Sequence, residues 1–522
     1  DGVFEAWSDG SDINEWNSTA ARLALQHEFA GGWLFYAAVD YVKDKSEPVP
    51  TSIPEGFDRD NDIYTLDPAE GLDCSIPAFA DWSGCWEDYS STMETTGFTM
   101  DITGPIGDYY TFKSITGYRE LEDDLDSNFG IFNYQQQTDQ DQFSQEFTLE
   151  SAYDGPINFI GGLYYFKEDA NLDFLFALQQ TLHIKTDAWA VFGEARWDIT
   201  DNWRVIGGIR YTDEEKDFVG QNVTLAAVPG FSFTDKSSFD DTNYRLALQW
   251  SVTQDVMLYT SYATGFKSGG YSSDCFGPVP ACFNPVDPES VKTWEVGMRS
   301  EFINNRLRLN ITYFDNTYED LQLGGSTPQG FIRFNVPEVE TNGFEAEVTF
   351  AATENLTFDG YIANLKGNSV ELDEHSIVAI AGSNPSPKCG GEIPDEECVI
   401  NNFDLKNAPD WNYMLGGTYH IQMQSGYFFN FRLSAAYEDD SYNLVANPEA
   451  VKRDETTIWD ARISFANPND TWSISLWGKN LSDEVYYPAA TTVGVGAIPG
   501  IPGLAFPGQP RTYGVDFRYT FN

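Results

Sequence analysis

Three aspartates at alternate positions have the spacing that most directly suggests metal chemistry. In "FDRDNDIYTLD", Asp58, Asp60 and Asp62 are spaced like the first three ligands of a calcium loop. That motif also needs a glycine where Ile63 stands and a glutamate at its twelfth position, which is Ala69. The sequence therefore excludes an EF-hand. It leaves a looser Ca²⁺ site in an acidic loop or, as the default, a solvated loop without a cation, and we expect no other cofactor.

The six cysteines fall into three pairs, each close in sequence and set among Pro, Gly, Asp and Ser: Cys74 with Cys85, Cys275 with Cys282, and Cys389 with Cys398. Six cysteines allow about 15 connectivities, of which three local disulfides are the simplest. Free thiols or a zinc site are the alternatives, but the chain has only 4 histidines and no CxxC spacing. Local disulfides indicate an oxidising compartment.

Aromatic and basic side chains in or beside these segments are candidate ligand contacts. Trp and Tyr around the first cysteine pair, and Phe flanking the second, can stack on sugar or macrocycle rings; alternatively they pack their own loop. Basic residues in "GFKSGG" and "GFIRFN" can meet an anionic ligand, or they balance acidic neighbours. The candidates are Trp82, Trp86, Tyr89, Phe276, Phe283, Lys267 and Arg333.

Composition limits the class of protein. The net charge of −51, from 81 acidic and 30 basic residues, excludes a duplex nucleic-acid partner, which requires cations to neutralise phosphates. An aromatic content of 15% is too high for a disordered acidic chain. No stretch approaches 18 consecutive apolar residues, so no transmembrane helix is expected. The 4 histidines lie in no recognisable nucleophile motif, and we therefore expect no enzyme.

The elements that must position these residues show a strict two-residue period. In the final "RTYGVDFRYTFN", every second residue from Tyr513 to Phe521 is apolar and the residues between them are mostly polar. The segments "YRLALQW", "LRLNITY", "FEAEVTF" and "WDARISF" repeat the pattern, and no segment has convincing helical periodicity. Such alternation is typical of strands with one apolar and one polar face.

Connections between these strands alternate in length. Short turns rich in Asn, Asp and Gly, such as 200–202, 303–305 and 353–355, alternate with long connections, such as 44–95 and 368–408. All three cysteine pairs lie in long connections. Soluble sandwiches, the alternative, have shorter strands. The pattern predicts a transmembrane antiparallel β-barrel with short periplasmic turns and long, disulfide-stapled extracellular loops.

We expect nineteen strands in this chain. Their approximate ranges are 17–29, 33–43, 96–103, 108–122, 141–152, 157–171, 184–199, 203–218, 241–252, 256–266, 290–302, 306–321, 339–352, 356–367, 410–421, 427–439, 456–466, 471–481 and 511–521. Bacterial single-chain barrels generally have an even number of strands. Since the chain begins abruptly at "DGVFEAWSDG", we expect the barrel to begin upstream of residue 1.

Several segments indicate a protein family as well as a fold. "KSITGYRELED", "GGIRYTDEEKDF", "SYATGFKSGGY", "KTWEVGMRSEFINNRLRLNITYFDNTYEDLQ" and "LWGKNLSDEVYY" resemble segments of TonB-dependent outer-membrane receptors, in register with the strands. The resemblance extends over nearly the whole chain. It implies that residues 1–522 are the barrel domain of a 22-stranded receptor whose plug, TonB box and first strands precede this sequence. One departure is that Asn522 follows the aromatic Phe521 on which such strands usually close.

The resemblance also implies a function: capture of a scarce, bulky nutrient by the extracellular loops and its import by TonB-coupled transport across the bacterial outer membrane. Expected partners are TonB, outer-membrane lipid and lipopolysaccharide, and a small-molecule or oligosaccharide ligand. Siderophore-like ligands rank first because they are the commonest use of the family. A passive porin-like channel and a surface adhesion or structural barrel remain alternatives.

The mass of the native membrane protein tests this expectation. This chain accounts for 58.5 kDa. We expect an intact mass larger by a plug domain of roughly 100–200 residues. A mass equal to that of this chain would instead favour an open channel or a surface scaffold.

Overall fold

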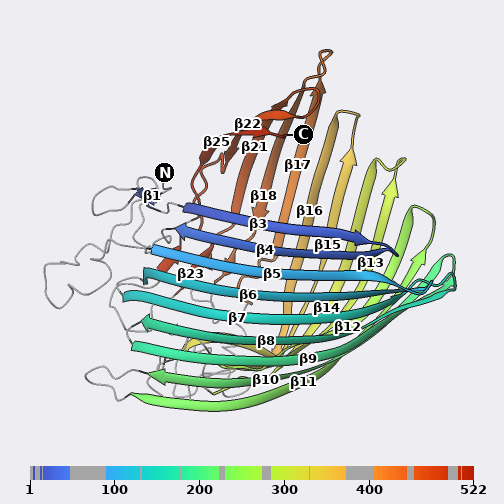
Figure 1. The fold of residues 1–522 in the computed structure, drawn as a ribbon. Helices are drawn as coiled ribbons and strands as arrows, with labels where there is room; N and C mark the ends of the chain where they lie inside the picture. The colour runs from blue at the N-terminus through green and yellow to red at the C-terminus, as the bar shows by residue number, and fades with distance from the viewer. Residues whose placement is uncertain are drawn as a thin grey trace.

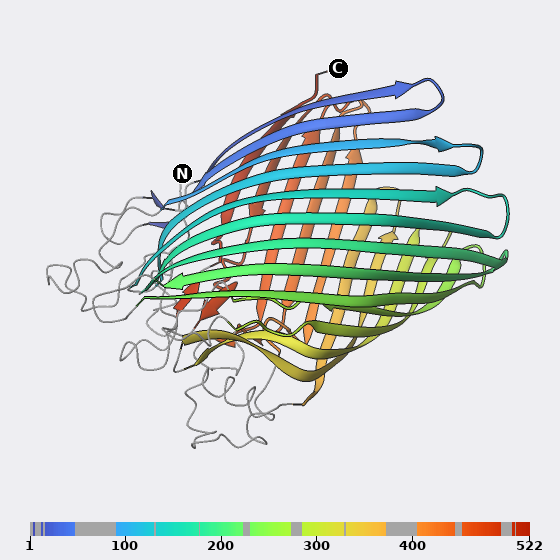
Figure 2. The ribbon, with the colours of Figure 1, turned by 60° about the horizontal axis from the view of Figure 1, so that its bottom comes forward.

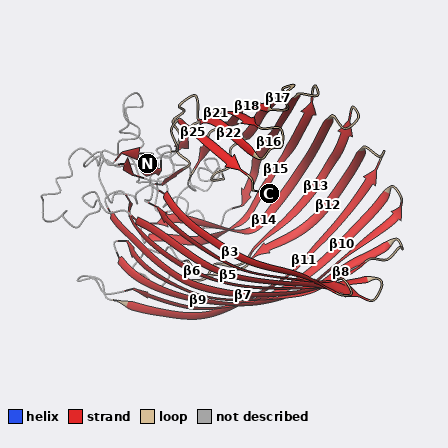
Figure 3. Cartoon of the chain, turned by 45° about the horizontal axis from the view of Figure 1, so that its top comes forward, coloured by secondary structure: helices blue, strands red, loops and turns tan. Residues whose placement is uncertain are grey.

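The computed structural model describes residues 4–5, 12–13, 16–46, 90–129, 132–176, 178–222, 230–272, 284–327, 330–371, 405–443, 452–491, 504–506 and 508–521. These residues form strands joined by turns and short irregular segments (Figure 3). No helix long and apolar enough to cross a membrane occurs in these ranges.

Nineteen strands form one barrel, in which each pairs antiparallel with the next along the chain (Figure 1). They are β3 (Trp16–Phe29), β4 (Trp33–Ser46), β5 (Ser90–Ile106), β6 (Tyr110–Phe129), β7 (Phe132–Ser151), β8 (Ile157–Phe176), β9 (Leu178–Thr200), β10 (Trp203–Asn222), β11 (Phe231–Ser251), β12 (Val256–Lys267), β13 (Glu289–Phe302), β14 (Leu307–Thr327), β15 (Gly330–Ala351), β16 (Leu356–Glu371), β17 (Trp411–Gln422), β18 (Phe428–Glu438), β21 (Thr456–Ala466), β22 (Trp472–Lys479) and β25 (Thr512–Tyr519). β25 precedes β3 in the strand order; residue by residue, β25 pairs with β22 and β3 pairs with β4.

Six short strands form three two-stranded sheets apart from the barrel. They are β1 (Phe4–Glu5) with β2 (Asp12–Ile13), β19 (Ser441–Tyr442) with β20 (Lys452–Arg453), and β23 (Ala489–Thr491) with β24 (Leu504–Phe506). The all-β class and nineteen barrel strands are therefore confirmed for the described part of the chain. The full count of twenty-two stays a prediction.

The two faces of the barrel wall differ as the alternation predicts. On β25, Tyr513, Val515 and Phe517 are 68%, 67% and 66% exposed, although all are apolar or aromatic. On its opposite face, Asp516 forms an ion pair with Arg462, with 2.8 Å between Asp516 Oδ2 and Arg462 Nη2. A continuous apolar face is typical of a barrel wall that meets lipid, and ion pairs are typical of a polar barrel interior. The apolar face is therefore the outer one.

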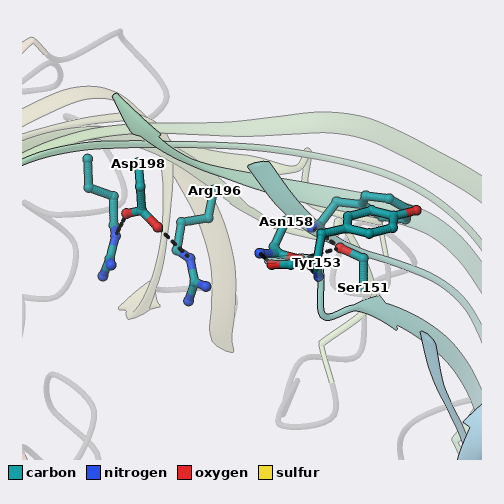
Figure 4. Close-up of polar contacts among 7 residues, drawn as sticks. Ser151, Tyr153, Asn158, Arg196 and Asp198 are labelled. Atoms are coloured by element: carbon teal, nitrogen blue, oxygen red, sulfur yellow. Dashed lines mark hydrogen bonds and ion pairs between the residues drawn. The ribbon is translucent and has the colours of Figure 1, made fainter. Parts of the chain in front are cut away.

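The short turns lie together along one rim of the barrel (Figure 2). Between β7 and β8, Asn158 Oδ1 accepts hydrogen bonds from the Tyr153 N–H at 2.6 Å and from Ser151 Oγ at 3.0 Å (Figure 4). Near the next turn, Asp198 lies between Arg204 Nε at 2.5 Å and Arg196 Nε at 3.9 Å. Asn158 thus satisfies a turn N–H that the sheet ladder leaves unpaired, and Asp198 pairs with arginines on both sides of its turn.

Strand ends at the turns match the sequence prediction within three residues. At the long connections some ends match as closely, such as those of β12, β13 and β21, whereas others differ by up to ten residues. β7 begins at Phe132 and β11 at Phe231, nine and ten residues before the predicted starts. Outside the bilayer both faces of a strand meet water, and the apolar alternation that marks a strand in sequence is lost there. The backbone hydrogen-bond pairing between neighbouring strands nevertheless continues there.

The turn between β13 and β14 contains a strained residue. Ile303 has φ = +56° and its side chain is 55% exposed. A β-branched residue in this region costs about 1–2 kcal/mol, whereas Asn tolerates it. We expect Ile303→Asn to raise the midpoint of thermal unfolding in detergent micelles, because strain is lost and little burial is given up.

The neighbouring Asn304, at φ = +54°, provides the matched control. Asn304→Ala places an intolerant residue in the same conformation and should lower the unfolding midpoint. If both substitutions moved the midpoint in the same direction, strain at this turn would not explain either.

Candidate functional site

The inner wall becomes apolar beyond the membrane, near the long connections. Leu182 of β9 and Phe218 of β10 are buried, at 1% and 0% exposure, with Leu172, Ile184, Phe233 and Tyr271 packed against them. By alternation, Phe218 lies on the face opposite the outward Ile209, which is 59% exposed. An apolar cluster inside a barrel is not required by lipid. Here it supports the chain segment that carries Tyr271.

Tyr271 attaches the chain segment that follows β12 to this apolar cluster. Its ring stacks on Phe218 with 4.3 Å between centroids and 10° between planes. Its hydroxyl donates to Asp235 Oδ2 at 2.9 Å and lies 2.8 Å from Ser237 Oγ. Burial raises the pKa of Tyr271 to about 12, and the Asp235 charge acts in the same direction. The phenol is therefore neutral at physiological pH and keeps its donor.

Two glycines let the segment lie close to the wall. A Cβ on Gly269 would stand 2.4 Å from the Phe239 ring and 2.5 Å from the Val286 carbonyl oxygen. Lys216 Nζ donates to the Gly269 carbonyl at 2.9 Å. Gly270 exchanges backbone hydrogen bonds with Val286, at 3.2 and 2.8 Å. The two ends of the β12–β13 connection are thus hydrogen-bonded to each other.

Side-chain amides of β14 and β15 hold both ends of this connection by hydrogen bonds. Gln322 Nε2 donates to the carbonyls of Ser268 and Asp287, each at 3.0 Å. Asn335 Oδ1 accepts from the Asp287 N–H at 2.9 Å, and Asn335 Nδ2 donates to the Asp287 carbonyl at 2.9 Å. We call residues 268–272 and 284–288, with these partners, the loop anchor. It holds the two ends of the connection on the inner wall.

Two predicted ligand contacts lie at the loop anchor. Lys267 ends β12, is exposed, pairs in register with Glu289, and makes no ion pair with any residue that the structure describes. Arg333 of β15 is exposed, pairs in register with Gly324, and precedes Asn335 by two residues. The structure places both at the same part of the mouth and shows no contact between them.

The other predicted site residues lie outside the described residues and stay predictions. They are Trp82, Trp86, Tyr89, Phe276 and Phe283; the cysteines Cys74, Cys85, Cys275, Cys282, Cys389 and Cys398; and the candidate calcium ligands Asp58, Asp60 and Asp62. Phe276 and Phe283 belong to the connection whose two ends the loop anchor holds. The described ranges contain no group of three or more acidic, His or Cys residues placed to hold a metal ion.

Sequence reasoning missed Tyr271, Gln322 and Asn335 as positioning residues. The "SGGY" segment carried a signal, because adjacent glycines before an aromatic residue indicate a close backbone approach. Nothing in the sequence identifies the partners, which lie on four other strands.

The comparison with known families decides the identity. A family model described as "TonB dependent receptor-like, beta-barrel" matches residues 3–481. The chain belongs to the TonB-dependent receptor family. A TonB-dependent receptor barrel is located in the bacterial outer membrane, which agrees with the lipid-facing outer wall. The loop anchor and the "SGGY" segment are thus features of an outer-membrane receptor barrel.

Its relatives include named siderophore receptors. A probable TonB-dependent siderophore receptor, PiuA, from Acinetobacter baumannii is 26% identical over 298 residues, covering 56% of this chain and 36% of that protein. The ferric-pyoverdine M114 receptor PbuA of Pseudomonas sp. (strain M114) is 20% identical, over 100% of this chain and 56% of that receptor. The chain thus spans little more than a third to just over half of these relatives' lengths.

Solved structures show the same fold. The ferric yersiniabactin uptake receptor FyuA from Yersinia pestis superposes with a TM-score of 0.79 at 17% identity, over 100% of this chain and 73% of that one. The siderophore receptor PiuA from Acinetobacter baumannii gives 0.73 at 16% identity, over 97% and 74%. At these identities the likeness shows the fold and leaves the ligand open.

Substitution of Tyr271 tests the loop anchor. Tyr271→Ala removes a stack of about 1 kcal/mol and hydrogen bonds of about 1 kcal/mol. We expect amide exchange at Gly270 and Val286 to accelerate more than about tenfold. Tyr271→Phe keeps the stack and should have a smaller effect. Tyr419→Ala, an exposed tyrosine on β17, is the control; equal effects of Tyr271→Ala and Tyr419→Ala would contradict the anchor.

Proposed function

We propose that this barrel belongs to an outer-membrane receptor that captures a ferric siderophore and imports it by TonB-coupled transport. The loop anchor carries the proposal, because it holds a long connection on the inner wall at the mouth, where a ligand enters. Membership of the TonB-dependent receptor family and the siderophore receptors among the relatives support it. An oligosaccharide ligand is the alternative.

Capture and release make opposing demands on such a site. A scarce ligand must be held tightly at low concentration, and a tightly held ligand leaves slowly. Work supplied through TonB resolves this conflict by changing the site after binding. In this proposal the barrel contributes the loops, the inner wall and the lipid-facing surface, and TonB acts on a segment outside this chain.

The outer wall supports lipid and lipopolysaccharide as further partners. Near the turns, Trp203 and Trp250 stack at 5.1 Å and 4°, in the position of an interfacial aromatic girdle. Toward the loops, Lys292 lies beside Glu319 on the neighbouring strand, and Lys185 is 3.0 Å from Asp169. We propose that lipid phosphates contact these lysines. A loosely bound Ca²⁺ at Asp58, Asp60 and Asp62 remains part of the proposal.

Uptake measurements test the import function. The full-length product of the gene, expressed in bacteria lacking their own siderophore receptors, should import radiolabelled ferric siderophore from a panel of chelators. We expect uptake to require both TonB and the proton gradient. Uptake that persists without TonB would identify a passive channel, and absence of uptake for every chelator would overturn the siderophore assignment.

A further inference from the structure

The barrel wall continues beyond the bilayer along β6–β9. On β7, Gln136 precedes the turn-side end, Ser151, by 15 residues, which is roughly 50 Å of strand. Because barrel strands are tilted by about 35–45°, Gln136 lies roughly 35 Å above that rim, whereas the apolar band of such barrels is about 25 Å tall. This part of the wall therefore stands above the bilayer and above the part of the lumen that the bilayer surrounds.

The two faces of this upper wall carry different charge. Alternation from the outward Tyr118, which is 38% exposed, assigns the acidic residues of the outer face. They are Glu120, Glu122, Asp124, Asp126, Asp139, Asp141, Asp169, Asp173 and Asp187. The inner face at 121–127, 134–140, 168–174 and 180–186 carries only Asp123 and Glu168 as acidic residues, and no lysine or arginine. Most of the negative charge of this wall thus faces outward.

Uncharged polar side chains form a row on the inner face of β7. We call Gln136, Thr138 and Gln140, all half-buried, the amide row. Tyr134 Oη donates to Gln136 Oε1 at 2.7 Å, and Gln136 Nε2 donates to Thr138 Oγ1 at 3.3 Å. Gln140 Nε2 donates to Glu168 Oε2 at 2.5 Å. These contacts leave one N–H of Gln136 and the hydroxyl hydrogen of Thr138 without a partner among the described residues.

Apolar side chains stand on both sides of the amide row. In register, Gln136 lies between Leu125 of β6 and Phe174 of β8. Thr138 has Leu172 of β8 as its partner. The inner face therefore presents a strip of hydrogen-bonding groups between apolar surfaces, a combination that suits ligands with both kinds of group.

The same surroundings disfavour negative charge. Asp123 pairs in register with Thr138, and burial raises the pKa of Asp123, with the charge of Asp124 acting in the same direction. An anionic ligand on the amide row would meet the same desolvation, and repulsion from Asp123 and Glu168, with no cation on this face to offset them. An uncharged ligand gains the hydrogen bonds and the apolar contacts without that penalty.

We propose that the amide row binds an uncharged ligand whose hydroxyl or amide groups alternate with apolar faces, and that it disfavours anionic ligands. Two sources have this chemistry: a neutral ferric tris-hydroxamate, under the proposed function, and an oligosaccharide, under its alternative. The choice between these two rests on the proposed function, whereas the preference for an uncharged ligand does not.

Calorimetric titration of the full-length receptor in detergent tests the proposal. The probes are ferrichrome, a neutral ferric tris-hydroxamate, maltoheptaose, a neutral oligosaccharide, and ferric enterobactin, an anionic tris-catecholate. We expect one neutral probe to bind saturably and at least about tenfold more tightly than ferric enterobactin. Equal or tighter binding of ferric enterobactin, or absence of saturable binding for both neutral probes, would overturn the proposal.

Variants locate the site. The double variant Gln136→Leu, Thr138→Val removes polar groups of the amide row at similar side-chain size, and should weaken binding of the neutral probe at least about fivefold. Gln137→Leu makes the matched change on the exposed outer face of the same strand and should leave binding unchanged. A heat-modifiable band on gels confirms that each variant has folded, and Thr138→Val alone serves if the double variant does not fold. Unchanged affinity in the amide-row variant, or an equal loss in Gln137→Leu, would contradict the site.

The two proposals fail separately. If a neutral probe binds through the amide row but no chelator is imported, the amide row stands and the transport function falls. If ferric enterobactin alone is bound and imported, the transport function stands and the preference of the amide row for uncharged ligands falls.

Discussion

The structure depends on one constraint: a backbone N–H or C=O group in lipid must find its partner within the protein. Successive strands meet it by pairing along the chain, from β3 with β4 through to β22 with β25. The connections on one rim are short, from two residues between β9 and β10 to five between β7 and β8. Side chains such as Asn158 complete the hydrogen bonds that these turns leave open.

Once the outer face is assigned to lipid, the inner face is free to vary along its height. At mid-height it carries ion pairs such as Arg432 with Asp359 and Arg119 with Asp40. Toward the loops it becomes apolar around Phe218, and there the connection after β12 lies on the wall. The loop anchor therefore lies on the inner face of the barrel, where lipid does not require apolar side chains.

Sequence periodicity predicted the class, the number of strands in this chain and the turn-side strand ends, because lipid imposes alternation wherever a strand is in the membrane. It underestimated β7 and β11, whose outer portions have water on both faces. For the site, "SGGY" and Lys267 were visible in sequence. The contacts from Tyr271 to Asp235 and from Gln322 to Ser268 were not, because only the register of distant strands brings these residues together.

Strand lengths differ around the barrel. β9 has 23 residues and β15 has 22, whereas β22 and β25 have 8 each. A difference of 15 residues corresponds to roughly 50 Å of strand. The height of the paired wall therefore varies around the barrel: it is tall along β6–β11 and low along β17–β25. The long strands therefore extend the paired inner wall further from the turn-side rim than the short strands do.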